Sequence, residues 1–245
     1  KTQECSRNLI TVAQDLLSMY SFPDETVRHN TLDFKLAQIA HICLKGQEGI
    51  KAATEICRHL AKGITDNRIS TFDFPDLLNS LACTQPFVFL DIFIGDDRIK
   101  SYQRRRMFSY DSDDFPKHNN PLHQISDDIL ICWCNNDPKK HYPLIATAIQ
   151  AFSKSSETGG LSWNPIVYSI FEKAPDLDIV LEKLADAIDP TSWSGSRADI
   201  LQTRSALFES LYQHDNAKIR AWAKTQYSAL QEKIKRVREL EKNHD

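Results

Sequence analysis

Apolar positions along the chain form pairs of helix-length stripes separated by short polar turns. In the C-terminal half, three such pairs lie in residues 129–152, 166–188 and 206–230. Each turn contains an aspartate, and successive aspartates are 39 residues apart: Asp137, Asp176 and Asp215. An isolated helical hairpin leaves one apolar face uncovered, so equal spacing indicates that neighbouring hairpins stack.

The same pattern occurs upstream, in residues 34–60 and 77–94. The turns at Gly46 and Gln85 are again 39 residues apart. We therefore predict an all-α fold, a HEAT- or ARM-like α-solenoid of about five helical hairpins in one domain, 1–245. Within it we expect an N-terminal helical cap at 1–30, repeats one and two at 31–95, an inserted loop at 96–125, and repeats three to five at 126–245, which end in a long C-terminal helix.

Two other interpretations compete with the solenoid. An ordinary helical bundle also contains antiparallel pairs with short loops. The run Phe87–Ile94 is rich in β-forming residues, but its place in the period predicts a buried helix. Elsewhere we find little indication of strands.

Composition and charge exclude several classes of protein. Hydrophobic residues make up 41% of the chain and charged residues 26%, which is typical of a soluble globular protein. The net charge of −3 argues against a dominant nucleic-acid surface. The seven glycines form no dinucleotide or P-loop motif, and no apolar run is long enough for a membrane span.

The six cysteines include no C-x-x-C pair, which favours a reduced, cytoplasmic compartment. Cys132 and Cys134 with His141 supply at most part of a metal site, and the spacing of His118 and His123 matches no known motif. We therefore expect no catalytic residues, no cofactor and no metal. Because the chain begins with Lys1, we also expect it to be part of a longer protein.

One segment supports a resemblance to a known class of proteins. The turn Trp193-Ser194-Gly195-Ser196 lies within residues 189–198 and is followed by Arg204, Leu207, Leu211, His214-Asp215 and Arg220-Ala221-Trp222-Ala223. This half of the chain resembles the C-terminal helical-repeat region of large bacterial multidomain proteins. Some of those carry an N-terminal NTPase or nuclease-like effector and act in defence against phages. The resemblance implies a sensor or scaffold module with a separate effector.

The same turn is also a candidate site. We expect Gly195 to adopt positive φ and Ser196 to cap the helix that begins at Arg197. We expect Trp193 to seal the gap between adjacent repeats. The alternative is that Trp193 contacts a ligand or peptide.

The inserted loop holds the candidate partner contacts. Aromatic and guanidinium side chains are typical of interaction surfaces, and here they are Tyr102, Arg104, Arg105, Arg106, Phe108 and Tyr110. The alternative is a charged loop that folds on itself, because Asp111, Asp113 and Asp114 follow at once.

The C-terminal helix has an apolar heptad seam and eight basic residues in 218–242. It is either the last solenoid helix with a solvated basic face or a surface that packs on another domain or chain. The seam residues are Ala223, Tyr227, Leu230, Ile234 and Val237.

These observations favour a non-enzymatic module for protein interaction or sensing. Its partner is expected to be another protein or another domain of the same parent chain, with no membrane contact. One alternative is a HEAT-like nucleic-acid-binding or DNA-repair protein, which needs a basic concave surface. The other is an unrecognised helical enzyme, which needs a pocket with convergent titratable groups.

Overall fold

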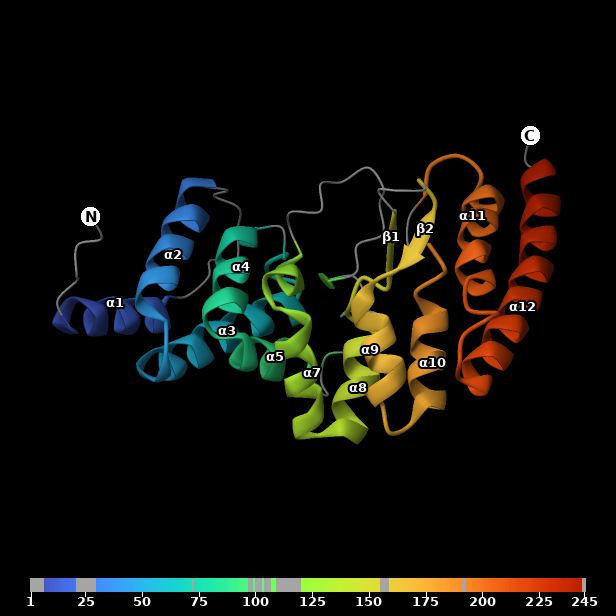
Figure 1. The fold of residues 1–245 in the computed structure, drawn as a ribbon. Coiled ribbons are helices and arrows are strands. Elements are labelled where there is room, and N and C mark those ends of the chain that lie inside the picture. Colours follow the sequence, from blue (N-terminus) through green and yellow to red (C-terminus); the bar gives the residue numbers. More distant parts are fainter. Residues whose placement is uncertain are drawn as a thin grey trace. The chain divides into compact units, whose positions relative to one another are not determined.

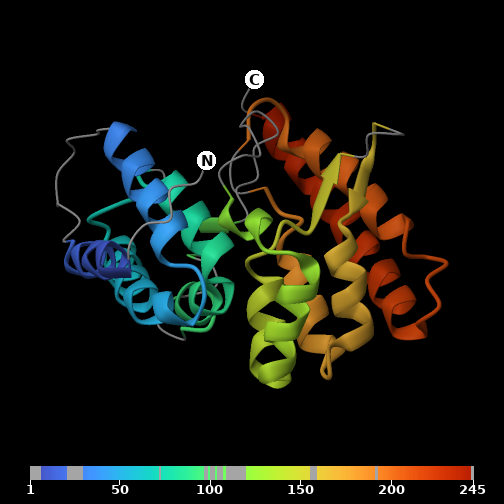
Figure 2. The same ribbon diagram turned by 60° about the vertical axis from the view of Figure 1, so that its left-hand side comes forward.

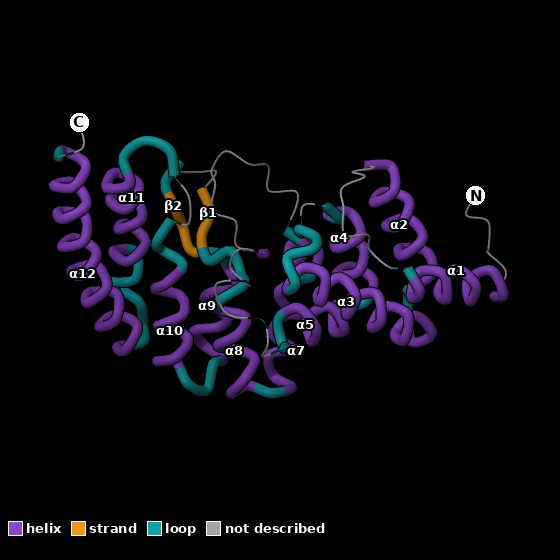
Figure 3. The backbone as a smooth tube through the Cα atoms, turned by 180° about the vertical axis from the view of Figure 1, so that it is seen from behind, coloured by secondary structure: helices purple, strands orange, loops and turns teal. Residues whose placement is uncertain are grey.

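The described part of the protein is mostly helical, with one two-stranded antiparallel sheet (Figure 3). The computed structural model describes residues 7–20, 30–71, 73–96, 99, 103, 107–108, 120–154, 159–190 and 193–243. The chain divides into two compact units, Lys1–Phe108 with Pro116–Asp137, and Ser109–Phe115 with Pro138–Asp245. The all-α class is confirmed. The continuous single solenoid stays a prediction, because the two units are described separately.

In the first unit, helices pack mainly on the helix two places further along the chain. Contacts join α1 to α3, α2 to α4, and α3 to α5, and Figures 1 and 2 show α2 beside α4. The elements are α1 Arg7–Met19, α2 Asn30–Cys43, the 3₁₀ turn η1 Gln47–Gly49, α3 Ile50–Thr65, α4 Pro75–Thr84, α5 Pro86–Phe93, the 3₁₀ turn η3 Pro121–Gln124 and α7 Asp127–Asn136.

Local sequence explains where these helices begin. Both α4 and α5 start with proline, whose missing N–H has no intrahelical partner in the first turn. Ser126 caps α7, and its side-chain oxygen accepts a hydrogen bond from the N–H of Ile129. The helix predicted for Phe87–Ile94 is confirmed as α5, whose Phe89, Leu90 and Phe93 are buried.

Several apolar residues described in segment 96–125 belong to the core of the first unit. Phe108 is only 1% exposed, and its ring packs edge-on against Phe89 and Phe93 at centroid distances of 6.0 and 6.2 Å. Leu122 and Ile125 are also buried, and η3 packs on α4. Phe108 is therefore a core residue, and its prediction as a partner contact is wrong.

The second unit contains paired helices and the sheet. Helix α11 lies beside α12 (Figures 1 and 2), α8 contacts α10, and β2 contacts α11. The elements are α8 Pro138–Ala146, β1 Phe152–Lys154, β2 Leu161–Trp163, α9 Pro165–Lys173, α10 Leu177–Asp186, α11 Arg197–Glu209 and α12 Ala217–Lys242.

The helix expected to continue to Phe152 ends earlier, at Ala146, and a short hairpin follows. Phe152 pairs with Trp163 across the two strands, and their rings meet edge to face at 6.5 Å. The indole N–H of Trp163 donates a 2.8 Å hydrogen bond to the carbonyl oxygen of Leu207. Two aromatic residues and one buried hydrogen bond thus anchor the hairpin on α11.

Many side-chain hydrogen bonds link residues 39 to 45 positions apart. In the first unit, Ser80 donates to the carbonyl oxygen of Ala37, and Gln85 donates to that of Gly46. The indole N–H of Trp133 donates to the carboxylate of Asp91 at 2.7 Å. In the second unit, the separation recurs in the pairs Asp178–Lys218, Asp189–Lys233 and Asp199–Arg238.

Over the described residues, the helices fall short of the length and apolar character that a membrane crossing requires.

Candidate interaction surface

The turn between α10 and α11 has the local geometry predicted from its sequence. Gly195 has φ of +73°, a conformation that glycine adopts without a Cβ clash. Ser196 caps α11, and its Oγ accepts a hydrogen bond from the N–H of Asp199 at 3.2 Å. Both predictions for this turn are confirmed.

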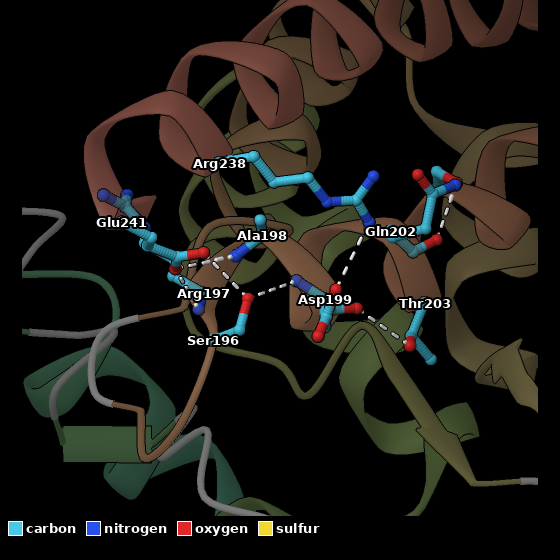
Figure 4. Close-up of polar contacts among 9 residues, drawn as sticks. Ser196, Arg197, Ala198, Asp199, Gln202, Thr203, Arg238 and Glu241 are labelled. Atoms are coloured by element: carbon cyan, nitrogen blue, oxygen red, sulfur yellow. Dashed lines mark hydrogen bonds and ion pairs between the residues drawn. The ribbon is translucent and has the colours of Figure 1, made fainter. Parts of the chain in front are cut away.

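A carboxylate from α12 completes the cap (Figure 4). Glu241 accepts hydrogen bonds from the backbone N–H groups of Arg197 and Ala198, at 2.7 and 3.3 Å, and from the Ser196 hydroxyl at 2.9 Å. A negative charge at a helix N-terminus satisfies free N–H groups and interacts favourably with the helix dipole. Glu241 therefore holds the end of α12 against the start of α11.

Asp189 binds two cations beside this cap. Its Oδ1 accepts from the Arg197 guanidinium at 2.8 Å, and its Oδ2 accepts from Lys233 Nζ at 2.6 Å. Partial burial acts against the charged form, but the hydrogen bonds from Lys233 and Arg197 outweigh it and hold the pKa of Asp189 below its usual value. Together with Glu241, Asp189 balances the charges of Arg197 and Lys233 on this surface.

The indole of Trp193 lies on the same surface and is 50% exposed. The Arg197 guanidinium carbon lies 4.7 Å from the centre of the indole ring, which is a cation–π distance. An indole that sealed a gap between helices would be buried, so the sealing role predicted for Trp193 is wrong. The alternative, that Trp193 contacts a ligand or peptide, stays a prediction.

A small cavity lies next to the Asp189–Lys233 pair, between α10, α11 and α12. Its volume is about 140 Å³. Ligand pockets for drug-sized molecules measure roughly 300–1,000 Å³, whereas a cavity of about 150 Å³ accepts a molecule the size of benzene. The cavity therefore has room for one side chain. It is lined by Ala185, Ile188, Asp189, Leu201, Phe208, Gln226, Ala229, Leu230 and Lys233.

The sequence did not reveal how these groups come together. Glu241 lies 45 positions from Ser196, and Lys233 lies 44 positions from Asp189. The available signal was the repeat period, since it places equivalent positions of successive repeats side by side. A search of α10 to α12 for polar residues about one repeat apart would have suggested the pairs Ser196–Glu241 and Asp189–Lys233.

The other candidates from the sequence divide into three groups. Tyr102, Arg104–Arg106 and Tyr110 lie outside the described residues. Cys132 is exposed and Cys134 buried on α7, so the two thiols point in different directions, and burial raises the pKa of Cys134 to about 12. Within the described residues, no three His, Cys, Asp or Glu side chains gather in a metal-binding cluster.

The seam of α12 is used inside the second unit. Ala223, Leu230 and Ile234 are buried, and α12 packs along α11. Part of the seam is therefore covered within the second unit, while the last solenoid helix with a solvated basic face and the surface for another domain or chain both stay predictions. Several of its basic residues form ion pairs with carboxylates: Lys218 with Asp178, Lys233 with Asp189, Lys235 with Glu232, and Arg238 with Asp199.

No protein-family model matches the chain, and none of the curated proteins or solved structures with which it was compared does so either. The resemblance to bacterial multidomain proteins therefore stays a prediction.

Proposed function

We propose that the protein is a non-enzymatic, helical-repeat interaction module that binds a protein segment at the surface around Trp193. The observation that carries the proposal is the half-exposed indole of Trp193, which lies against the guanidinium of Arg197. Arg197 in turn binds Asp189, which lines the small cavity. Tryptophan and arginine are enriched among the residues that dominate binding energy in interfaces. A surface already held by Glu241 and Asp189 loses little conformational entropy when a partner binds.

The long-range hydrogen bonds support a helical-repeat architecture. Separations of 39 to 45 residues in both units match the 39-residue spacing of the turns. Helices that contact the second helix along the chain are expected where hairpins stack side by side. We propose HEAT-like stacking within each unit.

The chemistry of the surface defines the partner segment. The cavity accepts one apolar side chain, since its wall includes Ile188, Leu201 and Phe208. Lys233 lines the cavity and its side chain is 41% exposed, so its ammonium group can donate a further hydrogen bond to an acidic residue next to the apolar side chain. The proposed ligand is therefore a peptide segment with an apolar residue beside an aspartate or glutamate.

Nucleic-acid binding is disfavoured by how the basic residues are used. Phosphate binding needs cations that are available to neutralise phosphates. On α12, Lys218, Lys233, Lys235 and Arg238 already face carboxylates within 3.2 Å. We therefore propose a protein partner rather than a nucleic acid. The separate effector, the role in phage defence, the contacts of residues 102–110 and the cytoplasmic location stay predictions.

Peptide selection on the intact chain tests the proposal. A displayed library of random linear peptides is selected on the wild-type protein after depletion on Trp193→Ala. We expect selected peptides to share an apolar residue next to an acidic one and to bind with micromolar affinity in fluorescence anisotropy. Leu240→Ala is the matched control, because Leu240 is a similarly exposed apolar residue on α12. If selected peptides share no such pattern and bind Trp193→Ala as well as the wild type, the surface is wrongly assigned.

A further inference from the structure

The cavity between α10, α11 and α12 has an apolar floor. Four of its lining side chains are themselves buried, at 0 to 8% exposure, and all four are hydrocarbon side chains. Such side chains offer van der Waals contacts to an occupant. They do not supply the polar partners, about two to four, that an ordered water molecule needs. The floor therefore suits an apolar group, and it consists of Ile188, Leu201, Phe208 and Leu230.

The lining residues that are not buried lie at the mouth of the cavity. Two of them are alanines: Ala185 on α10, which is partly exposed, and Ala229 on α12, which is exposed. Helices α10 and α12 contact each other, so these two residues flank the entrance from neighbouring helices. A methyl group leaves the entrance open, whereas a longer side chain at either position would reach into it. The other residues of the mouth are polar and partly exposed, and they are Asp189, Gln226 and Lys233.

The volume of the cavity limits the size of its occupant. Its 140 Å³ is close to the volume of an apolar cavity, roughly 150 Å³, that binds benzene. The ring of phenylalanine has the size of benzene, and the side chains of leucine and methionine are smaller. The fused rings of tryptophan are larger than benzene and would have to displace Leu201 or Phe208, which are core residues. Close-packed cores resist such displacement.

We propose that this cavity is a specificity pocket that receives one leucine, methionine or phenylalanine side chain of a partner segment and excludes tryptophan. The side chain enters between Ala185 and Ala229, which determine the specificity because they keep the entrance open. The proposal rests on the peptide-binding function, and it adds which side chain is selected and which residues select it.

Methyl NMR of the intact chain, with benzene as the probe, tests the pocket without a peptide. We expect benzene to shift the methyl signals of Ile188, Leu201 and Leu230, and indole at the same concentration to leave them unchanged. Ala229→Leu should abolish the benzene shifts because it fills the mouth. Ala221→Leu, the same change at an exposed site of α12 outside the cavity lining, is the matched control and should retain them.

Three results of this titration would overturn the proposal. The first is that benzene leaves the wild-type methyl signals unmoved. The second is that indole shifts them as much as benzene does. The third is that Ala229→Leu retains the benzene shifts. Far-UV circular dichroism checks that the variants remain helical, and Ala185→Leu repeats the test from the other side of the mouth if Ala229→Leu does not fold.

Peptides that differ only at the apolar residue test the selection itself. Taking a selected peptide, we expect versions with leucine, methionine or phenylalanine to bind at least about tenfold more tightly than versions with alanine or tryptophan. Fluorescence anisotropy measures these affinities. Ala229→Leu should bind the leucine version as weakly as the alanine version, and Ala221→Leu should bind both as the wild type does.

The two experiments distinguish this proposal from the peptide-binding function. Peptides that need Trp193, yet bind equally well with leucine, alanine or tryptophan at the apolar position, would overturn the pocket and leave the function standing. A library that yields no binding peptide would overturn the function and with it the selection, whereas the benzene shifts would remain a property of the cavity.

Discussion

Asp33 is a carboxylate buried between two helices, at only 5% exposure. It lies on α2 and accepts hydrogen bonds from the N–H groups of Asp76 and Leu77, both at 2.9 Å, so it caps α4 from outside. Burial raises the pKa of Asp33, while these two hydrogen bonds oppose that shift. Phe74, the N-cap residue of α4, makes no side-chain capping hydrogen bond, and Asp33, 43 positions before Asp76, supplies the cap instead.

We predict that Asp33→Ala lowers the free energy of unfolding by about 2 kcal/mol, since it leaves two N–H groups without their acceptor. Asp33→Asn should cost less, because it keeps one acceptor oxygen and buries no charge. Urea denaturation followed by circular dichroism measures both. Equal losses in the two variants would show that the capping oxygen is not what stabilises α4.

At the residue scale, Phe108 is a second buried side chain whose removal should destabilise the first unit. Its ring fills the space beside Phe89 and Phe93, so Phe108→Ala should cost about 3 kcal/mol through lost burial and a cavity. Phe87→Ala removes a partly exposed ring from the same unit and should cost less than about 1 kcal/mol. The urea midpoints of the two variants give the comparison, and equal values would place Phe108 outside the core.

The Asp189 ion pairs predict a dependence on pH. Because the folded pKa of Asp189 is lowered, the pairs stabilise the protein above the unfolded pKa of about 4 and are lost as pH falls below it. Since the group is partly exposed and screened by solvent, Asp189→Asn should cost no more than about 1 kcal/mol at pH 7. The difference from wild type should shrink towards pH 3.

Urea titrations at the two pH values measure this effect. Asp215→Asn, which removes a carboxylate at an exposed turn position, serves as the matched control. A constant difference between Asp189→Asn and wild type at both pH values would contradict the assignment.

At the scale of elements, the sequence predicted where helices begin, but it did not predict which side chains distant in the sequence form hydrogen bonds with one another. Ser126, Asp176 and Ser196 cap helices as polar residues before apolar runs are expected to do. The α5 helix was predictable because its position in the period outweighed its β-forming residues. The hairpin at 152–163 was missed because the period was extended through Phe152, although Ser, Gly and alternating aromatic positions follow.

Glu241 of α12 caps the start of α11 and so links two helices. Its removal leaves the first N–H groups of α11 without a carboxylate, so Glu241→Ala should lower the free energy of unfolding by about 1 kcal/mol. Glu239→Ala, two positions earlier on the exposed side of α12, should have little effect. Hydrogen exchange at Arg197 and Ala198 should accelerate only in Glu241→Ala. Unchanged exchange there would show that the cap does not hold the two helices together.

At the scale of the whole molecule, the 39-residue period predicted the helical class and the positions of most turns. It did not predict the division into two units at Asp137–Pro138, which falls inside the third predicted hairpin. Nor could it predict that Phe108 belongs to the core, because an apolar residue in a polar segment fits a contact loop equally well. The candidate surface was predictable only in part, through Trp193, Gly195 and Ser196, since Glu241, which binds Ser196 and the N–H of Arg197, comes from a helix one repeat away.

Calorimetric titration of a selected peptide measures whether the surface around Trp193 binds a protein segment. We expect Trp193→Ala and Lys233→Ala each to weaken binding at least about tenfold, which corresponds to about 1.4 kcal/mol. The control Leu240→Ala should bind as the wild type does. Equal affinity of the wild type and Trp193→Ala for every selected peptide would contradict the claim.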